Sequence, residues 1–266
     1  MLLENRTAIV YGGGGAVGGA VARAFAREGA QIFLAGRTRA RLDAVAGGIR
    51  AAGGTAETAT VDVLDEVATA RHADTVVERT GRIDVTFNGF GADNGEQGVP
   101  LLELSADAYC RPVTEYVRAQ FVTAAATAPH LTRQGSGTIL ALSNPMAGQP
   151  TALTGAFGQA GAAVESLARQ LAAELGPHGV RVACLRPTGM PDTVDQGSHT
   201  REVWSRAAAR LGTSLERLLA EVGSGSPLGR QLTAADVAEA AAFLASDRAG
   251  GLTGTVVNVS GGAVAD

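Results

Sequence analysis

The sequence predicts a doubly wound α/β domain, in which a mainly parallel sheet carries helices on both faces. Two observations predict it: 266 residues with 45% hydrophobic content, and short apolar runs that alternate with helical patterns along the whole chain. Parallel neighbouring strands need crossover connections, which are usually helices, so this alternation places helices on both faces of the sheet. We expect one domain, residues 1–266.

The expected elements follow from the period of the apolar residues. Runs of strand length occur at 7–11, 31–35, 56–61, 83–88, 138–142, 180–185 and 255–259. Helical patterns lie between them at 17–28, 42–52, 67–80, 119–128, 162–175 and 234–246. Residues 188–227 interrupt this order with polar, glycine-rich edges around Trp204, Leu211 and Leu218. Because ligands bind beyond the carboxyl ends of such strands, we expect this insertion in the C-terminal half to form a substrate lid.

The composition argues against several functions. A net charge of −4 disfavours electrostatic attraction to nucleic acid or to anionic lipid. Cys110 and Cys184 form no paired pattern, which is typical of reduced thiols in the cytoplasm. Prolines and glycines interrupt the uncharged stretch 134–164, and the four histidines lack metal-ligand spacing. We expect a cytoplasmic protein with a small-molecule substrate, no metal, no nucleic acid and no membrane partner.

Glycines follow the first expected strand, at 12–15 and 18–19. Between a strand and a helix, glycines let the backbone approach a pyrophosphate, and the first amides of the helix face it. Arg37 follows the second strand, where an acidic residue would accept hydrogen bonds from the 2′-hydroxyl of NAD. A guanidinium there binds a 2′-phosphate instead, which favours NADP(H). Arg39 and Arg41 fit a solvated helix face better.

In these motifs and in those that follow, the chain resembles the classical short-chain dehydrogenase/reductase (SDR) family over nearly its whole length. The segment from Tyr11 to Gly18 is similar to the family's Thr-Gly-x-x-x-Gly-x-Gly turn, and Asp62-Val63 to its adenine-contacting pair. Asn88-Gly89-Phe90-Gly91 resembles its Asn-Asn-Ala-Gly segment, and Pro187 opens the equivalent of its Pro-Gly turn. The family's pattern also matches 172–182, Leu228-Gly229-Arg230, Leu252-Thr253-Gly254 and Gly261-Gly262.

This resemblance implies a Rossmann-type fold and a homodimer or homotetramer that pairs through the helices at 119–128 and 162–175. The cofactor-binding positions that it implies are Gly12, Gly14, Gly15, Ala16, Val17, Gly18, Arg37, Asp62, Val63, Asn88, Gly89 and Pro187.

The family's catalytic asparagine, serine, tyrosine and lysine are all replaced at the positions that the resemblance assigns. Phe157 stands at the tyrosine position and Gly161 at the lysine position; Asn144 replaces the serine, with Ser143 beside it, and Tyr116 replaces the asparagine. Phe157 has no ionisable proton and Gly161 has no charge. All 22 basic side chains of the Lys and Arg count are arginines, so no lysine compensates. Ordinary ketoreductase activity is not expected.

Three function classes stay open. The favoured one is an NADP(H)-linked oxidoreductase that acts on a small metabolite, with Tyr116, water or a substrate group supplying the proton. The others are a non-redox dehydratase, isomerase or cyclase, and a catalytically silent member that binds a ligand or a partner. We expect Tyr116, Asn144 and Phe157 to line one cavity below the segment that carries Trp204. Candidates for its rim are Asp93, Asn94, Glu96, Asp192, Asp195 and His199.

Overall fold

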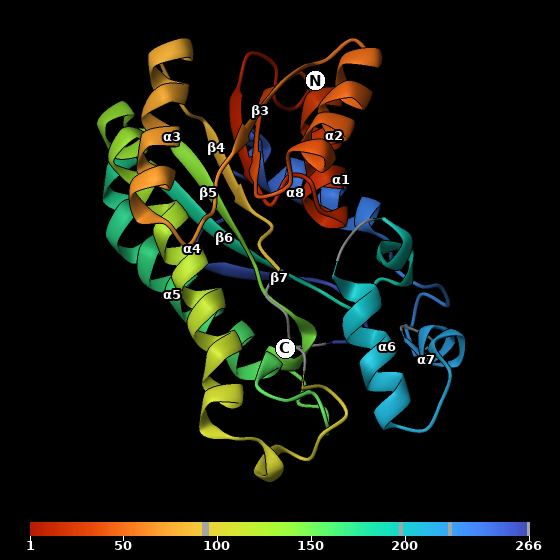
Figure 1. Cartoon of the computed structure of the whole chain (residues 1–266). Coiled ribbons are helices and arrows are strands. Elements are labelled where there is room, and N and C mark those ends of the chain that lie inside the picture. The colour runs from red at the N-terminus through yellow and green to blue at the C-terminus, as the bar shows by residue number, and fades with distance from the viewer. Residues whose placement is uncertain (92–95, 197–198, 223–224, 265–266) are drawn as a thin grey trace.

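Seven parallel strands form one sheet in the order β3-β2-β1-β4-β5-β6-β7 (Figure 1). The computed structural model describes the chain except for residues 92–95, 197–198, 223–224 and 265–266. The strands are β1 (Thr7–Tyr11), β2 (Gln31–Gly36), β3 (Thr55–Thr60), β4 (Val85–Asn88), β5 (Gly137–Leu142), β6 (Val180–Pro187) and β7 (Thr255–Val259). The predicted doubly wound sheet is confirmed, since the order reverses between β1 and β4.

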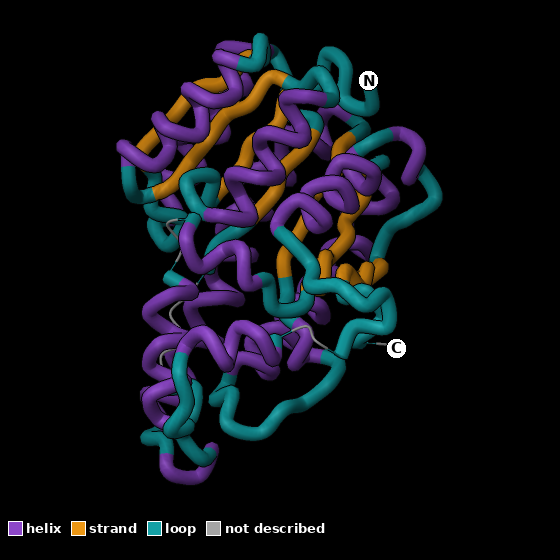
Figure 2. The backbone as a smooth tube through the Cα atoms, turned by 90° about the vertical axis from the view of Figure 1, so that its right-hand side faces the viewer, coloured by secondary structure: helices purple, strands orange, loops and turns teal. Residues whose placement is uncertain are grey.

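Helices cover both faces of this sheet. One face carries α1 (Ala16–Arg27), α2 (Arg39–Ala51) and α8 (Ala234–Ala245), and the other carries α3 (Glu66–Thr80), α4 (Ala106–Gln134) and α5 (Phe157–Leu175) (Figure 1). Two further helices, α6 (Thr200–Arg210) and α7 (Leu215–Glu221), lie beyond the carboxyl ends of the strands. Figure 2 shows the strands gathered in one half of the molecule and mostly helices and loops in the other.

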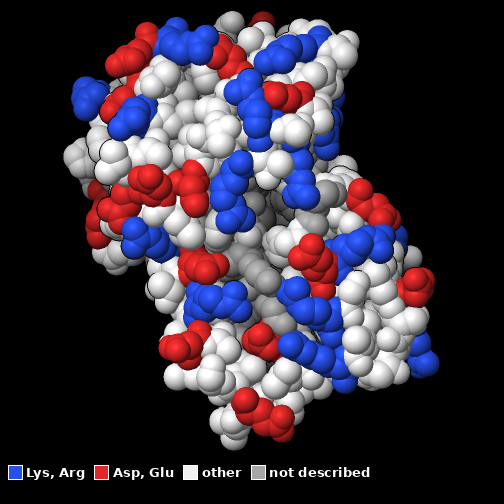
Figure 3. Space-filling view, in the orientation of Figure 1, with Lys and Arg blue, Asp and Glu red and all other residues white. Residues whose placement is uncertain are grey.

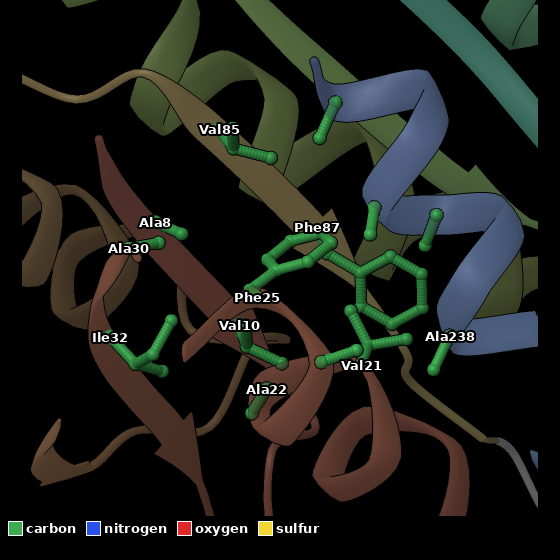
Figure 4. Packing of buried hydrophobic residues seen from close by; sticks show 14 of the residues in the cluster. Ala8, Val10, Val21, Ala22, Phe25, Ala30, Ile32, Val85, Phe87 and Ala238 are labelled. Carbon is green, nitrogen blue, oxygen red and sulfur yellow. The ribbon is translucent and has the colours of Figure 1, made fainter. Parts of the chain in front are cut away.

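Apolar side chains fill the space between the sheet and each helical layer. Phe25 of α1 and Phe87 of β4 are fully buried and lie among Val10, Val21 and Ala238, from β1, α1 and α8 (Figure 4). Burial on both faces is what a parallel sheet requires, because helices cover each of them. The two layers fix the positions of the strand ends, where the loops of the candidate site begin.

Two helix boundaries differ from the sequence-based expectation. The helix α4 runs unbroken through Pro112 and Pro129, so it spans 29 residues. The helix α5 begins at Phe157, five residues before the expected start, in a segment whose two glycines lower its intrinsic helix propensity. Tertiary packing explains this start: a Cβ on Gly158 would lie 2.7 Å from the Met146 carbonyl oxygen, so only a glycine allows this approach.

His72 of α3 makes the stability of the fold dependent on pH. Its ring is 8% exposed and meets Tyr11 edge-on, with 5.7 Å between the ring centroids. Burial lowers the pKa of His72 to about 4, below its ordinary value of 6.5. Between these two pH values the unfolded chain binds more protons than the folded protein. The contribution of His72 to the free energy of unfolding is therefore complete above pH 6.5 and is lost as the pH decreases toward 4.

We expect His72 to contribute a loss of about 3 kcal/mol in the free energy of unfolding as the pH falls from about 7 to about 4. The variant His72→Leu should lack this part of the pH dependence, which denaturant titrations at several pH values would measure. His130→Gln is the matched control, because His130 has an exposed carboxylate partner, Asp74, at 2.9 Å, whereas the His72 ring meets an aromatic ring. An unchanged slope in His72→Leu would contradict the assignment.

Candidate functional site

The turn between β1 and α1 lies so close to other backbone segments that side chains cannot enter it. Gly12 has a φ of +72°, and a Cβ there would lie 2.7 Å from the carbonyl oxygen of Gly89. A Cβ on Gly18 would collide with the carbonyl oxygen of Gly12. Glycine is therefore required at both positions. The turn brings the ends of β1 and β4 and the start of α1 together at the carboxyl edge of the sheet.

The start of α1 offers backbone amides at this edge. Gly15 is the N-cap residue, and no side chain caps the helix. The first amides of any helix lack an intrahelical partner and carry partial positive charge. Among the described residues, a Cβ on Gly15 would have only the Gly12 carbonyl oxygen near it, at 3.3 Å, so the turn is open there. Ala16 is buried and Val17 packs against the core. This open, uncapped turn fits the pyrophosphate of a dinucleotide.

Arginines lie beside the same turn. Arg37 follows β2, is exposed, and forms no ion pair within the described part of the chain. Arg39 pairs with Asp43 on the same helix at 2.8 Å, as expected for a solvated helix face. Arg41 is also exposed, but its Cβ lies 3.0 Å from the place that a Cβ on Gly14 would take. Arg41 therefore lies close to the glycine turn, although the sequence favoured a solvated helix face for it.

The residues after β3 are arranged around a tight turn. Asp62 is exposed, and its carboxylate accepts a hydrogen bond from the Leu64 amide at 3.0 Å. Val63 is buried in the core between the sheet and the layer of α3, α4 and α5. Asp62 and Val63 thus lie at the carboxyl edge, where the resemblance placed an adenine contact.

Asn88, the last residue of β4, ties that strand to α4. Its Nδ2 donates to the Ala119 carbonyl oxygen at 2.9 Å and to Thr123 Oγ1 at 2.7 Å. Its Oδ1 accepts from the Phe90 amide at 2.8 Å. The amide group is therefore engaged within the protein. Through these bonds Asn88 sets the path of Gly89 and Phe90 over the glycine turn.

Tyr116 joins two phenylalanines in a row of aromatic rings. Its ring centroid lies 6.1 Å from that of Phe90 and 6.1 Å from that of Phe157, and both contacts are edge-on. Tyr116 is 7% exposed. Edge-on contacts between aromatic rings add stability to that which the burial of their apolar area supplies. The three rings therefore form a stable apolar wall. Of the three residues expected in one cavity, Tyr116 and Phe157 are in direct contact.

Asn144 faces α5. Its Nδ2 donates to the Phe157 carbonyl oxygen at 2.8 Å, and its Oδ1 accepts from the Met146 amide at 3.1 Å, at the start of the 3₁₀ helix η2 (Pro145–Ala147). A Cβ on Gly161 would lie 2.5 Å from that Nδ2. The Asn144 side chain therefore takes the space that any side chain at residue 161 would need.

We expect Gly161→Ala to lower the free energy of unfolding by about 1–3 kcal/mol, because the added methyl displaces the Asn144 amide from its two hydrogen bonds. In an Asn144→Ala background the same substitution should cost clearly less. Denaturant unfolding of all four proteins gives the coupling energy. Gly47→Ala in α2 is the control, since no atom of the described residues lies within 4 Å of a Cβ there. Equal costs in both backgrounds would mean that the two residues do not compete for space.

A buried ion pair lies next to Ser143, the residue before Asn144. Arg186 of β6 and Glu165 of α5 are 5% and 3% exposed, and two nitrogens of the guanidinium meet the two carboxylate oxygens at 2.7 Å. Ser143 Oγ donates to Glu165 Oε1 at 2.8 Å, and Arg186 Nη1 donates to Asn258 Oδ1 at 3.1 Å. The Ser143 hydroxyl is therefore part of a cluster that joins β5, β6, β7 and α5. The sequence analysis missed Glu165 and Arg186; a charged residue inside the apolar run 180–187 was the available signal.

The insertion after Pro187 contacts the loops at the carboxyl edge. In α6, the Trp204 ring carbons Cη2 and Cζ2 lie 3.5 Å from the place that a Cβ on Gly189 would take. The His199 imidazole lies against Gly91 in the loop after β4. Figure 3 shows a hollow near the middle of this face with blue arginine side chains on both sides of it. The insertion thus lies against the loops that follow β4 and β6.

Of the other expected rim residues, Glu96, Asp192 and Asp195 are described, and each carboxylate has at least one partner. Glu96 pairs with Arg210 at 3.0 Å, and Arg210 also donates to the Gln97 carbonyl oxygen. Asp195 pairs with Arg201. Asp192 accepts from the Ala234 amide at 3.1 Å, at the start of α8. Asp93 and Asn94 lie outside the described residues.

Among the residues that the structure describes, no group of three or more His, Cys, Asp or Glu side chains is arranged to hold a metal ion. Within the same ranges, no helix has both the length and the apolar character needed to cross a bilayer.

Together, the parallel sheet and the glycine turn at its carboxyl edge define an α/β protein of the dinucleotide-binding class. A family model described as enoyl-(acyl carrier protein) reductase matches residues 14–264. An uncharacterized oxidoreductase of Mycobacterium tuberculosis is 34% identical over 264 residues, 98% of this chain and 92% of that protein. The short-chain reductase protein NovJ of Streptomyces niveus is 31% identical, over 97% of this chain and 94% of its own.

A solved structure agrees with these matches. A short-chain type dehydrogenase/reductase from Mycobacterium ulcerans has a TM-score of 0.82 and 27% identity, covering 98% of this chain and 90% of the other. The chain belongs to the short-chain dehydrogenase/reductase family, and membership suggests the use of a nicotinamide cofactor.

Proposed function

We propose that the protein is an NADP(H)-linked oxidoreductase that acts on a small metabolite without a Tyr-x-x-x-Lys pair. The observation that carries this proposal is the glycine turn, where Gly12 and Gly18 exclude any Cβ and α1 begins without a side-chain cap. Residues 12–18 would hold the pyrophosphate, Arg37 the 2′-phosphate, and Asp62 and Val63 the adenine. Asn88, Gly89 and Pro187 would border the nicotinamide half. When bound, the nicotinamide supplies or accepts a hydride.

The residues at the family's catalytic positions support an atypical route. Phe157 and Gly161 offer neither a proton nor a charge, and the Asn144 amide is engaged by its neighbours. Tyr116 carries a hydroxyl that can donate a hydrogen bond to a substrate oxygen. Its ring and those of Phe90 and Phe157 would exclude water from the reacting atoms and orient the substrate. Positioning of this kind supplies much of what hydride transfer needs.

Trp204 makes cofactor binding measurable, because it is the single tryptophan of the chain. Reduced nicotinamide absorbs light at wavelengths where tryptophan emits, so NADPH bound beside the lid should quench Trp204 and emit in turn. Trp204→Phe should abolish this transfer while calorimetry still detects binding. The proposal would be refuted if the wild type showed neither heat of binding nor energy transfer.

If turnover of carbonyl, imine or enone compounds is found, Tyr116→Phe should lower it roughly 10²-fold.

The second candidate is a non-redox function, as a dehydratase, isomerase or cyclase, or as a silent ligand-binding member. The engaged amide of Asn144 beside Gly161 favours it, since no group at these two positions can exchange a proton. Binding of NADPH with no cofactor oxidation across ketones, imines and enones would select this candidate.

We also propose a cytoplasmic homodimer or homotetramer that pairs through α4 and α5. The Phe121 side chain of α4 supports this assembly, because it is 52% exposed. Phenylalanine is enriched at subunit interfaces relative to the rest of the surface, so its position on α4 fits this assembly. Sedimentation that shows only monomer at micromolar concentration would contradict the assembly.

A further inference from the structure

His199 is an ionisable side chain that the fold brings to the carboxyl edge of the sheet from a distant part of the chain. It is the N-cap residue of α6 and is half-buried against Gly91. A Cβ on Gly91 would lie 3.1 Å from His199 Nδ1 and 3.4 Å from Nε2, and it would collide with Cε1 between them. The edge of the imidazole that carries both nitrogens therefore faces the loop after β4. The ring occupies this position because glycine has no Cβ; a side chain at position 91 would displace it.

This contact places the imidazole beside the candidate substrate pocket. Gly91 directly follows Phe90, whose ring begins the aromatic row through Tyr116 to Phe157. In the same helix as His199, Trp204 lies against Gly189, two residues beyond the end of β6. The helix α6 thus crosses the ends of β4 and β6, with His199 at the β4 side.

The other three histidines lie elsewhere. His72 is buried in α3 against Tyr11, and His130 pairs with Asp74 near the end of α4. His178 precedes β6 and so lies at the opposite, amino edge of the sheet. Imidazole is the side chain that holds and releases a proton near neutral pH most readily. His199 is the histidine that the structure places at the candidate site.

Several charged groups on the segments around His199 have partners, and the carboxylate of Glu202, in the first turn of α6, is exposed. Asp195, on the preceding 3₁₀ helix η4 (Pro191–Asp195), pairs with Arg201 of α6. Glu96, on the loop after β4, pairs with Arg210 at the far end of α6. Arg206 of α6 is half-buried and also has an interaction partner. Asp93, on the same loop as Gly91, lies outside the described residues.

We propose that His199 is the catalytic acid, which protonates the substrate oxygen while Tyr116 holds it. This proposal rests on the proposed oxidoreductase function. In the reductive direction a hydride joins the carbonyl carbon with its two electrons, and the π electron pair of the C=O bond moves onto oxygen. The imidazolium N–H bond breaks and its proton joins that oxygen, which leaves an alcohol, a neutral imidazole and the oxidised cofactor. Because His199 is only half-buried, solvent can return the proton.

The first test measures proximity to the nicotinamide without any substrate. The protein is labelled with ¹⁵N at its histidines, and NMR follows their resonances as a function of pH, once with NADPH bound and once with NADP⁺ bound. The resonance that disappears in His199→Gln belongs to His199, and its pKa is compared between the two complexes. The oxidised ring carries a positive charge that the reduced ring lacks. At about 6 Å in a partly screened site, that charge lowers an imidazole pKa by about one unit. We expect His199 to show this difference and His130, the internal control, to show none.

The second test measures proton donation, with phenanthrenequinone, a flat aromatic diketone, as the probe. The rate of NADPH oxidation should fall as the pH rises through the pKa that NMR gives for His199. In His199→Gln, kcat should drop roughly 10²-fold, the pH dependence should disappear, and KM should change little. A merely structural histidine would change KM or stability and leave the pH profile in place.

The outcomes separate this inference from the proposed function. Absence of NADPH binding, by calorimetry and Trp204 fluorescence, overturns both. Binding with energy transfer from Trp204, together with a His199 pKa that is equal in the two cofactor complexes, overturns only the role of His199. If the quinone is not reduced by the wild type, the NMR comparison alone decides.

Discussion

Arg186→Met should lower the free energy of unfolding by about 3–5 kcal/mol, the largest effect on stability that we expect from one substitution. The variant leaves the Glu165 carboxylate, which is 3% exposed, without its guanidinium partner. A carboxylate in that position has lost its hydration, and Ser143 supplies only one of the hydrogen bonds that it needs. Denaturant unfolding at neutral pH measures the loss.

Two variants make this prediction specific to the buried pair. Arg186→Met combined with Glu165→Leu should recover most of the loss, because no unpaired charge then remains in the interior. Arg27→Met is the matched surface control: Arg27 pairs with Glu239 between side chains that are 57% and 60% exposed. Its cost should stay below about 1 kcal/mol. If the double variant were no more stable than Arg186→Met alone, packing rather than charge would explain the effect.

Arg37→Ala should weaken the binding of NADPH by about 10- to 100-fold and leave the binding of NADH unchanged. Arg37 directly follows β2 at the carboxyl edge of the sheet, is exposed, and has no ion-pair partner in the described ranges. Its charge-assisted hydrogen bonds to a 2′-phosphate would be lost, whereas NADH has no phosphate there. Calorimetry with both cofactors measures the two affinities. We expect both to be weak for the family, since Gly161 provides no anchor for the nicotinamide ribose.

Arg39→Ala is the control for this substitution. Arg39 lies two residues further along and is already paired with Asp43, so its removal should change neither affinity by more than about twofold. Equal affinities for NADPH and NADH that Arg37→Ala leaves unchanged would refute the assignment of NADP(H).

Local sequence patterns were sufficient for the sheet and the glycine turn. The run at 7–11 and the glycines after it predicted β1 and the start of α1, because apolar period and glycine content are properties of neighbouring residues. The absence of lysine and the identities of Phe157 and Gly161 are likewise read directly from the chain. These residue identities alone exclude a Tyr-x-x-x-Lys pair from the site, whatever the distances between its side chains.

Contacts between distant segments needed the tertiary structure. The start of α5 depends on Gly158 and Gly161 packing against the loop after β5, which overrides the low helix propensity of glycine. The Glu165–Arg186 pair and the contact of His199 with Gly91 join segments that no local spacing relates. Propensity and periodicity act over a few residues, whereas these contacts arise where the sheet order and the crossover helices bring loops together. The sequence by itself determined which groups are available, and the packing of the layers decided which of them meet.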